Sequence, residues 1–169
     1  MKQILRGFFL VLGLGCVSSI YGGMTNSGVF SVKNSMAWMD ITNEITGVIE
    51  AERSKFLKLT NYGTASLDDC IMMDEVATLG VLTANGTQFL KDLTVSGGDT
   101  TLTSCQLENL FISEAPFENE SHPPQVILNG NTIINGSIEF KVASATVYKG
   151  PNVVILGETR NGMLVDLQE

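Results

Sequence analysis

The middle of the sequence repeats itself. Residues 47–58 contain Gly-Val-Ile-Glu-Ala followed by Phe-Leu-Lys, and residues 80–91 contain Gly-Val-Leu-Thr-Ala followed by Phe-Leu-Lys in the same frame. Six of these twelve aligned positions are identical, and the similarity continues past short insertions to Met72 and Leu107. A fixed period of this length is typical of stacked arrays, in which each unit buries its apolar side only against its neighbours.

Glycine spacing divides each repeat in two. Glycines recur at intervals of 16 or 17 residues and, further on, at about twice that interval: Gly47, Gly63, Gly80, Gly97, Gly130 and Gly162. Between them the apolar residues form short alternating runs, which predict short strands. We therefore expect an all-β chain that folds as a single-stranded parallel β-helix (solenoid), with coils of about 17 residues, two or three short faces per coil and an N-terminal cap.

A second period runs through the same region. Apolar residues recur every five residues at Leu102, Leu107, Ile112 and Phe117, and residues 57–72 show a similar spacing. This pattern resembles that of pentapeptide-repeat solenoids, which have square coils. A pentapeptide-repeat-like solenoid is therefore the alternative fold.

The repeat also predicts which side chains share an internal column. If one repeat is two coils, equivalent residues lie two coils apart, at about 10 Å. The predicted columns pair Ala51 with Ala84, Phe56 with Phe89, and Cys70 with Cys105.

For the two cysteines, the expected exported location and the expected coil spacing lead to different predictions about a disulfide. Export favours a disulfide, but two coil spacings put the Cα atoms of Cys70 and Cys105 about 9–10 Å apart, beyond the limit of about 7 Å for a disulfide. We expect both to be buried, reduced and unbonded. If the repeat were one large coil, they would be direct neighbours at about 4.8 Å and could bridge.

The N-terminus has the pattern of an export signal. Residues 1–22 combine Lys2 and Arg6 with an apolar stretch and then small residues, which predicts a signal peptide cleaved after Gly22 or Gly23. As the alternative, Gly-Leu-Gly-Cys ending at Cys16 resembles a lipobox, which would make Cys16 the lipid-bearing first residue. The expected location is exported: periplasmic, outer-surface or secreted. A membrane is a partner only if Cys16 is lipidated.

The remainder of the chain is interpreted as one domain with a cap. Residues 23–46 form the predicted N-terminal capping segment, with a helix or strand at 35–45 and Trp38 packed on the first coil. Residues 47–169 form the predicted solenoid. A proline- and glutamate-rich stretch at 114–125 interrupts the pattern and predicts a protruding loop.

The net charge of the chain limits the kinds of partner that it can bind. The chain has 10 basic and 18 acidic residues, a formal net charge of −8. This acidity argues against nucleic acid or an anionic lipid surface as a partner. We expect the protein to bind itself, a cell-surface component or a glycan.

The frame Gly-Val-x-x-Ala … Phe-Leu-Lys … Leu-Thr … Gly … Leu-x-x-Cys resembles that of exported bacterial right-handed β-helix proteins, adhesin-like and bactofilin-like in pattern. The resemblance covers roughly residues 47–162. It implies a right-handed coil in a protein of the cell envelope, and its motifs are structural.

Few residues suggest catalysis. His122 is the only histidine and lies in the predicted loop, so we expect no catalytic site, no cofactor and no enzyme activity. A calcium site is a weaker possibility, because carboxylates are the ligands calcium prefers. Its candidate residues are Asp68, Asp69, Asp74 and Glu75, and the alternative is a solvated edge. Three glycosylation sequons begin at Asn85, Asn119 and Asn135 and are interpreted as turns.

The function expected from these patterns is that of a non-enzymatic exported β-solenoid in surface structure, adhesion or self-association. The alternative is a carbohydrate-active β-helix enzyme or a glycan-binding module.

Overall fold

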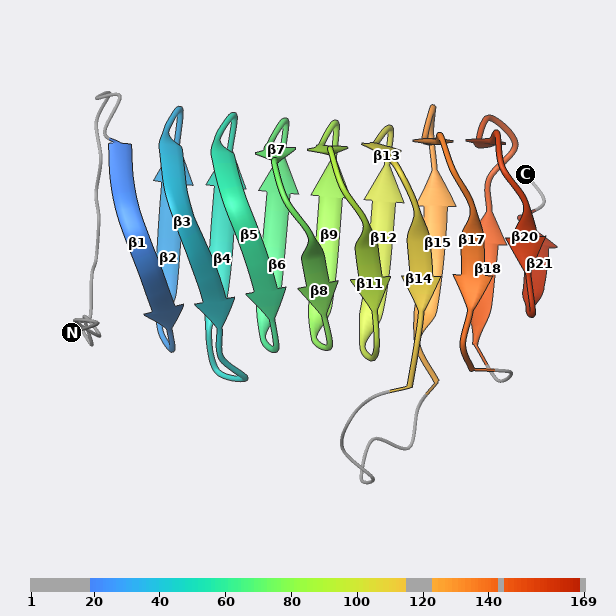
Figure 1. Ribbon diagram of the computed structural model, residues 1–169, viewed down its shortest axis with the longest axis horizontal. Helices are drawn as coiled ribbons and strands as arrows, with labels where there is room; N and C mark the ends of the chain where they lie inside the picture. The colour runs from blue at the N-terminus through green and yellow to red at the C-terminus, as the bar shows by residue number, and fades with distance from the viewer. Residues whose placement is uncertain (1–18, 115–122, 143–144, 168–169) are drawn as a thin grey trace.

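The computed structural model describes residues 19–114, 123–142 and 145–167. These residues form a stack of short strands without a helix, so no helix that could cross a membrane occurs among them. Two parallel sheets, one of thirteen and one of eight strands, face each other along the stack (Figure 1).

Each turn contributes one strand to the eight-stranded sheet, which we call sheet B. Its strands are β2 (Val29–Lys33), β4 (Val48–Glu52), β6 (Thr64–Asp68), β9 (Val81–Asn85), β12 (Asp99–Thr103), β15 (Gln125–Asn129), β18 (Thr146–Lys149) and β21 (Met163–Asp166).

The thirteen-stranded sheet, sheet A, changes character along the stack. Its first three strands are continuous: β1 (Ser19–Asn26), β3 (Met36–Asn43) and β5 (Lys55–Asn61). Each later turn supplies two short strands, namely β7 (Ile71–Met72) with β8 (Val76–Thr78), β10 (Gln88–Phe89) with β11 (Leu93–Val95), β13 (Gln106–Leu107) with β14 (Leu110–Ile112), β16 (Ile133–Ile134) with β17 (Ile138–Phe140), and β19 (Val154–Ile155) with β20 (Thr159–Arg160).

The stack is a right-handed solenoid, as predicted. In Figure 1 strands β1, β3 and β5 run downward in front, β2, β4 and β6 run upward behind, and the chain advances from left to right. All neighbouring strands pair in parallel, and the step from Thr64 to its partner Val81 is the predicted 17 residues. Right-handed crossovers are the strong preference for parallel strands.

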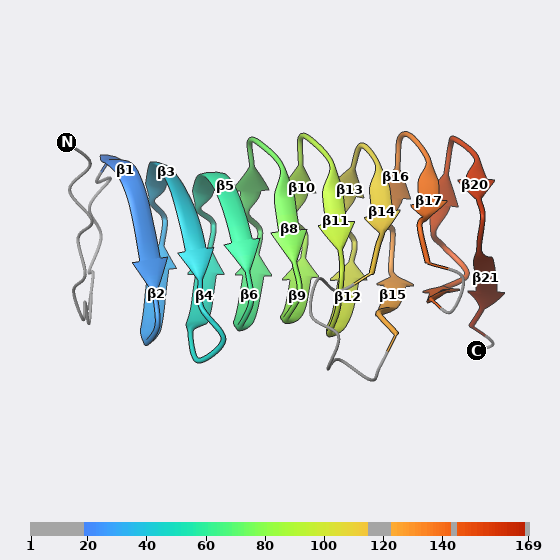
Figure 2. The same cartoon turned by 60° about the horizontal axis from the view of Figure 1, so that its bottom comes forward.

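The coils change from two faces to three at β5. This strand pairs with both β7 and β8 of the next turn, which residues 73–75 separate. Figure 2 shows the three faces of the following turn from β10 through β11 to β12.

Three faces explain the five-residue period. The side chains that point inward from one such stretch are all buried: Thr100, Leu102, Cys105, Leu107, Leu110 and Ile112. In the earlier stretch Leu57 and Tyr62 are only half-buried. The five-residue spacing is therefore local, and the described turns do not have the square coil of the alternative fold.

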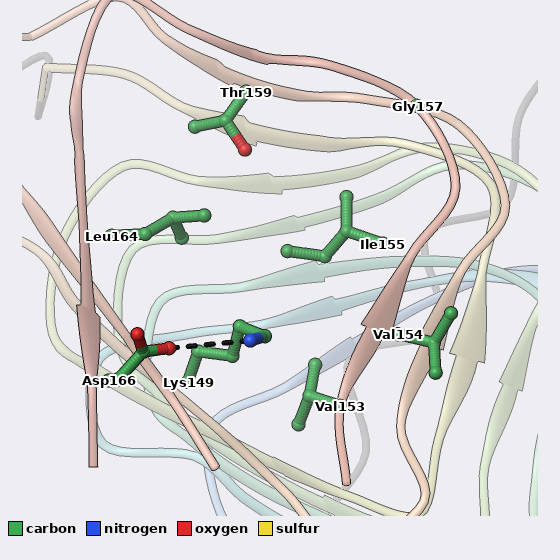
Figure 3. A pocket seen from close by; sticks show the side chains of 8 residues that line it. All are labelled: Lys149, Val153, Val154, Ile155, Gly157, Thr159, Leu164 and Asp166. Atoms are coloured by element: carbon green, nitrogen blue, oxygen red, sulfur yellow. Dashed lines mark hydrogen bonds and ion pairs between the residues drawn. The ribbon is translucent and has the colours of Figure 1, made fainter. Parts of the chain in front are cut away.

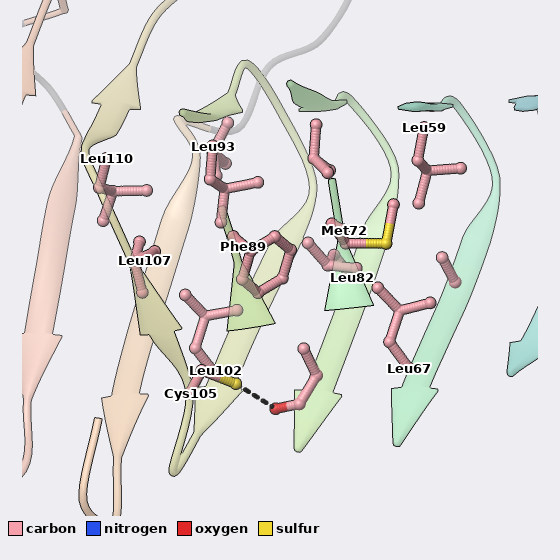
Figure 4. Close-up of a cluster of buried hydrophobic side chains, with 14 of the residues drawn as sticks. Leu59, Leu67, Met72, Leu82, Phe89, Leu93, Leu102, Cys105, Leu107 and Leu110 are labelled. Atoms are coloured by element: carbon pink, nitrogen blue, oxygen red, sulfur yellow. Dashed lines mark hydrogen bonds between the residues drawn. The ribbon is translucent and has the colours of Figure 1, made fainter. Parts of the chain in front are cut away.

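The predicted columns are present. Leu67 lies between Ala51 and Ala84 in the register of sheet B. Met72 lies between Phe56 and Phe89 in sheet A. Figure 4 shows Met72, Phe89 and Leu107 following one another along the axis. One repeat is thus two turns.

The glycines serve two different corners. At the corner that precedes sheet B, a Cβ on Gly80 would overlap the carbonyl oxygen of Gly63, so successive turns approach too closely for a side chain. Gly98, not Gly97, continues this series, because a Cβ on Gly98 would overlap the carbonyl oxygen of Gly80 in the same way. Gly130 belongs instead to the opposite corner.

That opposite corner has one residue in the left-handed region after each of the first six strands of sheet B. The residues share φ values between 48° and 59° and follow directly after a strand of sheet B: Asn34, Arg53, Asp69, Gly86, Ser104 and Gly130. Only glycine adopts this conformation without strain. Because most of these positions are not glycine, the sequence carries no common signal for them.

The solenoid begins before the repeat. Residues 23–46, expected to be a cap, contain β2 and β3, which pair with β4 and β5 as ordinary turns. Residues 36–43 alternate between buried and outward positions as strand β3 instead of forming a helix. Trp38 faces outward and is 40% exposed, and Ile45 is 80% exposed. Of the two alternatives for residues 35–45, the strand is therefore confirmed and the helix is wrong.

Two other expectations concern residues that the structure does not describe. They are the signal peptide up to residue 18, with Cys16, and the centre of the 114–125 loop, with Asn119 and His122. The strands on either side of that loop, β14 and β15, keep the regular stacking.

We expect Phe89→Ala to lower the free energy of unfolding by about 3–5 kcal/mol, because the side chain is 2% exposed between Met72 and Leu107. Leu90→Ala is the matched control: its side chain points outward, is 49% exposed, and its loss should cost no more than about 0.5 kcal/mol. Denaturant unfolding of both variants measures the difference. Equal losses would contradict the assignment of Phe89 to the core.

The hydroxyl of Thr100 faces the core without a hydrogen-bond partner. Its neighbours in the column are Leu82 and Val126. Thr100→Val should therefore stabilise the fold, by about 1 kcal/mol, since an unpaired buried hydroxyl carries its full desolvation cost. Thr87→Val, which removes a paired hydroxyl from another internal column, should destabilise the fold. Thermal unfolding of the two variants should shift in opposite directions.

Candidate functional site

The four carboxylates of the calcium candidate are separated by the fold. Asp68 ends β6, where its Oδ1 accepts a hydrogen bond from Asn85 Nδ2 at 2.8 Å, and Asp69 occupies the left-handed corner. Asp74 and Glu75 lie beyond β7, and Glu75 pairs with Lys58 at 3.4 Å. Within the described ranges no three His, Cys, Asp or Glu side chains are placed to hold a metal ion.

A ladder of buried amides runs along the first four turns. Asn26 Nδ2 donates to Asn43 Oδ1 at 2.7 Å, and Asn43 Nδ2 donates to Asn61 Oδ1 at 2.8 Å. Asn61 Nδ2 then donates to Thr78 Oγ1 at 3.0 Å, and the Thr78 hydroxyl donates to the carbonyl of Gly80 at 3.1 Å. Every amide is satisfied within the stack, so the ladder braces the corner next to the glycines and leaves no group for a ligand.

Hydroxyl and thiol side chains form a second internal column. The backbone N–H of Cys70 donates to Thr87 Oγ1 at 3.3 Å, and that of Cys105 donates to Thr132 Oγ1 at 3.2 Å. Gln88 pairs with Ile71 on one side and with Gln106 on the other, so the preceding Thr87 lies between the two cysteines. Both cysteines are buried and free, as the two-turn repeat predicted. The hydroxyl of the Asn85 sequon is this Thr87, and it is enclosed in the core.

Neither thiol is suited to nucleophilic chemistry. Cys70 Sγ donates to the carbonyl of Asp68 at 3.3 Å. Cys105 Sγ lies 3.4 Å from the carbonyl of Ala84 (Figure 4). Burial raises the pKa of the Cys70 thiol and raises the pKa of the Cys105 thiol to about 11. Because the thiolate is the reactive form, both cysteines act as small core residues.

The last described turn surrounds an open hollow of about 540 Å³. Figure 3 shows Val153, Ile155 and Leu164 pointing into it, with the Lys149–Asp166 ion pair at one side, where Nζ and Oδ1 are 3.3 Å apart. The sequence analysis did not predict this hollow, because Lys149 and Asp166 form no sequence motif and are brought together only by the strand register.

The exposed face of sheet B is the most regular outward surface. From β6 to β15 every second residue points outward, and these twelve residues form rows along the axis. Eight carry a hydroxyl or amide, two are acidic, two are apolar and none is basic: Thr64, Ser66, Asp68, Val81, Thr83, Asn85, Asp99, Thr101, Thr103, Gln125, Ile127 and Asn129. We call this set the sheet B face.

Comparison with known proteins yields no relative. No protein-family model matches the chain, and neither a curated protein nor a solved structure matches it.

A thiol titration of denatured, non-reduced protein should find both Cys70 and Cys105 free, and the native protein should react slowly. Their raised pKa values favour the protonated form in the folded state. The contribution of these thiols to the stability of the fold is therefore fully present below the pKa of an unfolded cysteine, near 9. It is lost as the pH rises towards about 11, the pKa of Cys105 in the folded protein. Unfolding midpoints measured across that window should fall less in Cys105→Val than in the unsubstituted protein. Absence of free thiols would contradict the two-turn column.

Proposed function

We propose that the protein is an exported, non-enzymatic β-solenoid that acts through its surface, in adhesion or in the structure of the cell envelope. The observation that supports this most is the sheet B face, a long, polar and regularly spaced surface on a rigid stack. Solenoids use extended surfaces of this kind for binding, because the repeats set a fixed spacing between equivalent side chains.

Export rests on the leader pattern of residues 1–22. The fold bears on where the leader would be cut, since Ser19–Gly22 pair with Met36–Met39 as the first half of β1. Cleavage after Gly22 would remove that pairing, whereas processing at Cys16 would keep β1 whole. The intact mass of the exported protein separates the two starts.

A non-enzymatic role fits the dispersal of the candidate groups. Asp68 bonds Asn85, Glu75 bonds Lys58, and the two carboxylates lie on different sides of one turn. A polysaccharide lyase would need a base to remove a proton from a ring carbon and an acid to protonate the departing oxygen, both within reach of the same linkage.

Glycan binding is the second candidate, and the chemistry of the sheet B face favours it. Its hydroxyl and amide groups can both donate and accept hydrogen bonds, as sugar hydroxyls do. The absence of basic residues from these twelve positions fits a neutral polysaccharide better than an acidic one.

A glycan array and co-sedimentation with insoluble neutral polysaccharides test this proposal. Thr83→Lys with Thr101→Lys places two long cations in the middle of the face and should weaken binding at least about tenfold. The matched control is Thr60→Lys with Thr94→Lys, two outward positions of sheet A, which should leave binding unchanged. Equal losses in both pairs would remove the sheet B face from the proposal.

Polysaccharide turnover is the other measurement. We expect none with the native protein. Degradation of any polysaccharide that Asp68→Asn or Asp69→Asn abolishes would replace the binding role with an enzymatic one.

A further inference from the structure

We propose that Asn129 is a site of spontaneous deamidation, at which the backbone nitrogen of Gly130 attacks the side-chain amide and the amide becomes a carboxylate. This modification is independent of the proposed surface role. It is expected from the hydrogen bonds around the Asn-Gly dipeptides, which the fold places in different surroundings.

The reaction proceeds through a cyclic imide. The Gly130 nitrogen bonds to Cγ of Asn129, the Cγ–Nδ2 bond breaks, and the amide proton of Gly130 leaves with Nδ2 as ammonia. Water then opens the ring at either carbonyl, which gives aspartate or isoaspartate. Glycine hinders the attack least, because it has no side chain next to the attacking nitrogen. An N–H that donates a hydrogen bond must first break that bond, so bonding of the glycine N–H slows the reaction.

One Asn-Gly dipeptide at a corner of the stack is fully bonded. The chain contains four such dipeptides, which begin at Asn85, Asn129, Asn135 and Asn161. The Gly86 N–H donates to the carbonyl of Thr103 at 3.0 Å. Asn85 Nδ2 donates to Asp68 Oδ1 at 2.8 Å. The last of the four lies across from residues 143–144, which the structure does not describe.

Asn135–Gly136 is bonded in the same way. The Gly136 N–H donates to the carbonyl of Glu108 at 2.7 Å, and Asn135 Nδ2 donates to Oε1 of the same glutamate at 3.2 Å. In both dipeptides the attacking nitrogen and the amide under attack are therefore each engaged.

Asn129–Gly130 lacks both bonds. Neither the Gly130 N–H nor Asn129 Nδ2 has a hydrogen-bond partner among the described residues, and Gly130 is exposed. The carbonyls of Asn85 and Asn129 are held alike, each by one backbone N–H and one threonine hydroxyl. The two dipeptides thus differ in the bonding of the glycine N–H and of the asparagine amide.

The difference arises at the left-handed corner that follows sheet B. The five corner residues before Gly130 each donate their N–H to a carbonyl one turn ahead, at 2.8 to 3.0 Å: Asn34, Arg53, Asp69, Gly86 and Ser104. Ahead of Gly130, Leu128 pairs with Lys149, and the next carbonyl is that of Gly150. This carbonyl accepts the N–H of Val153 at 3.2 Å within its own turn. The Gly130 N–H is therefore left without the bond that its equivalents make.

Exposure alone would rank the sites in the opposite order. Asn85 is exposed, whereas Asn129 is half-buried. The glycines that follow them have nearly the same φ, 59° at Gly86 and 57° at Gly130. A faster reaction at Asn129 would therefore report the missing hydrogen bonds and not a more open surface.

The modification would alter the sheet B face. Asn129 is one of its twelve residues, so the reaction adds a carboxylate to a face that has two acidic residues and no basic one. The isoaspartate product also lengthens the backbone by one methylene directly after β15.

The test is ageing of the folded protein at neutral pH in oxygen-18 water, which labels each new carboxylate, followed by peptide mapping. We expect label at Asn129 to accumulate at least about tenfold faster than at Asn85 or Asn135, because two hydrogen bonds must break first at each of those sites. The same incubation in denaturant is the control, in which the three sites should react at similar rates.

Amide hydrogen exchange of the folded protein gives a second measurement. The Gly130 N–H should exchange faster than the Gly86 N–H, since only the latter is hydrogen-bonded. Equal labelling of Asn129 and Asn85 in the folded protein, faster labelling of Asn85, or slower exchange at Gly130 than at Gly86 would each overturn the proposal.

Discussion

The stacking of equivalent residues is the constraint on which the rest of this structure depends. Each turn donates and accepts its backbone hydrogen bonds along the axis, so a turn is complete only when the next lies about 4.8 Å away in the same register. At the corner next to sheet B this spacing leaves no room for a Cβ, as the close approach of Gly80 to the Gly63 carbonyl shows. The register, once set there, places every other side chain in a column.

Columns decide which polar groups the core can hold. Asn43 is tolerated inside because Asn26 lies on one side and Asn61 on the other, so each amide finds its partner one turn away. The ladder ends at Thr78, and the next member of that column is the apolar Val95. A lone amide there would be buried without a partner, at a cost of about 1–3 kcal/mol. The buried amides of this core therefore occur in a run that ends at Thr78, where the backbone accepts the last bond. Thr100, whose buried hydroxyl has no partner, is an exception to such pairing.

The stacking of residues in columns also explains which features of the fold could be predicted from the sequence. Identical residues two turns apart, such as Phe56 and Phe89, reveal the period because a column selects for shape. The left-handed corner could not be found this way, since Arg53, Asp69 and Ser104 share a backbone conformation and no side-chain property. The first turns were misassigned for a related reason: they lack the repeated residues, and Trp38 faces solvent, where no column acts on it. The carboxylates clustered in sequence are separated in space because strand β7 lies between Asp69 and Asp74.

A stack of this kind has no internal reason to stop, so its ends must be specified by chemistry. An apolar column whose last residue is apolar leaves a surface on which another turn can pack, from the same chain or from a second one. The column that begins with Val32 continues in register to Lys149 and Asp166, whose ion pair at 3.3 Å lies at the surface of the last described turn, where the Asp166 side chain is 81% exposed, and adds little to stability. The residues that fill a column therefore change along the stack, as do the coils themselves, which pass from two faces to three at β5.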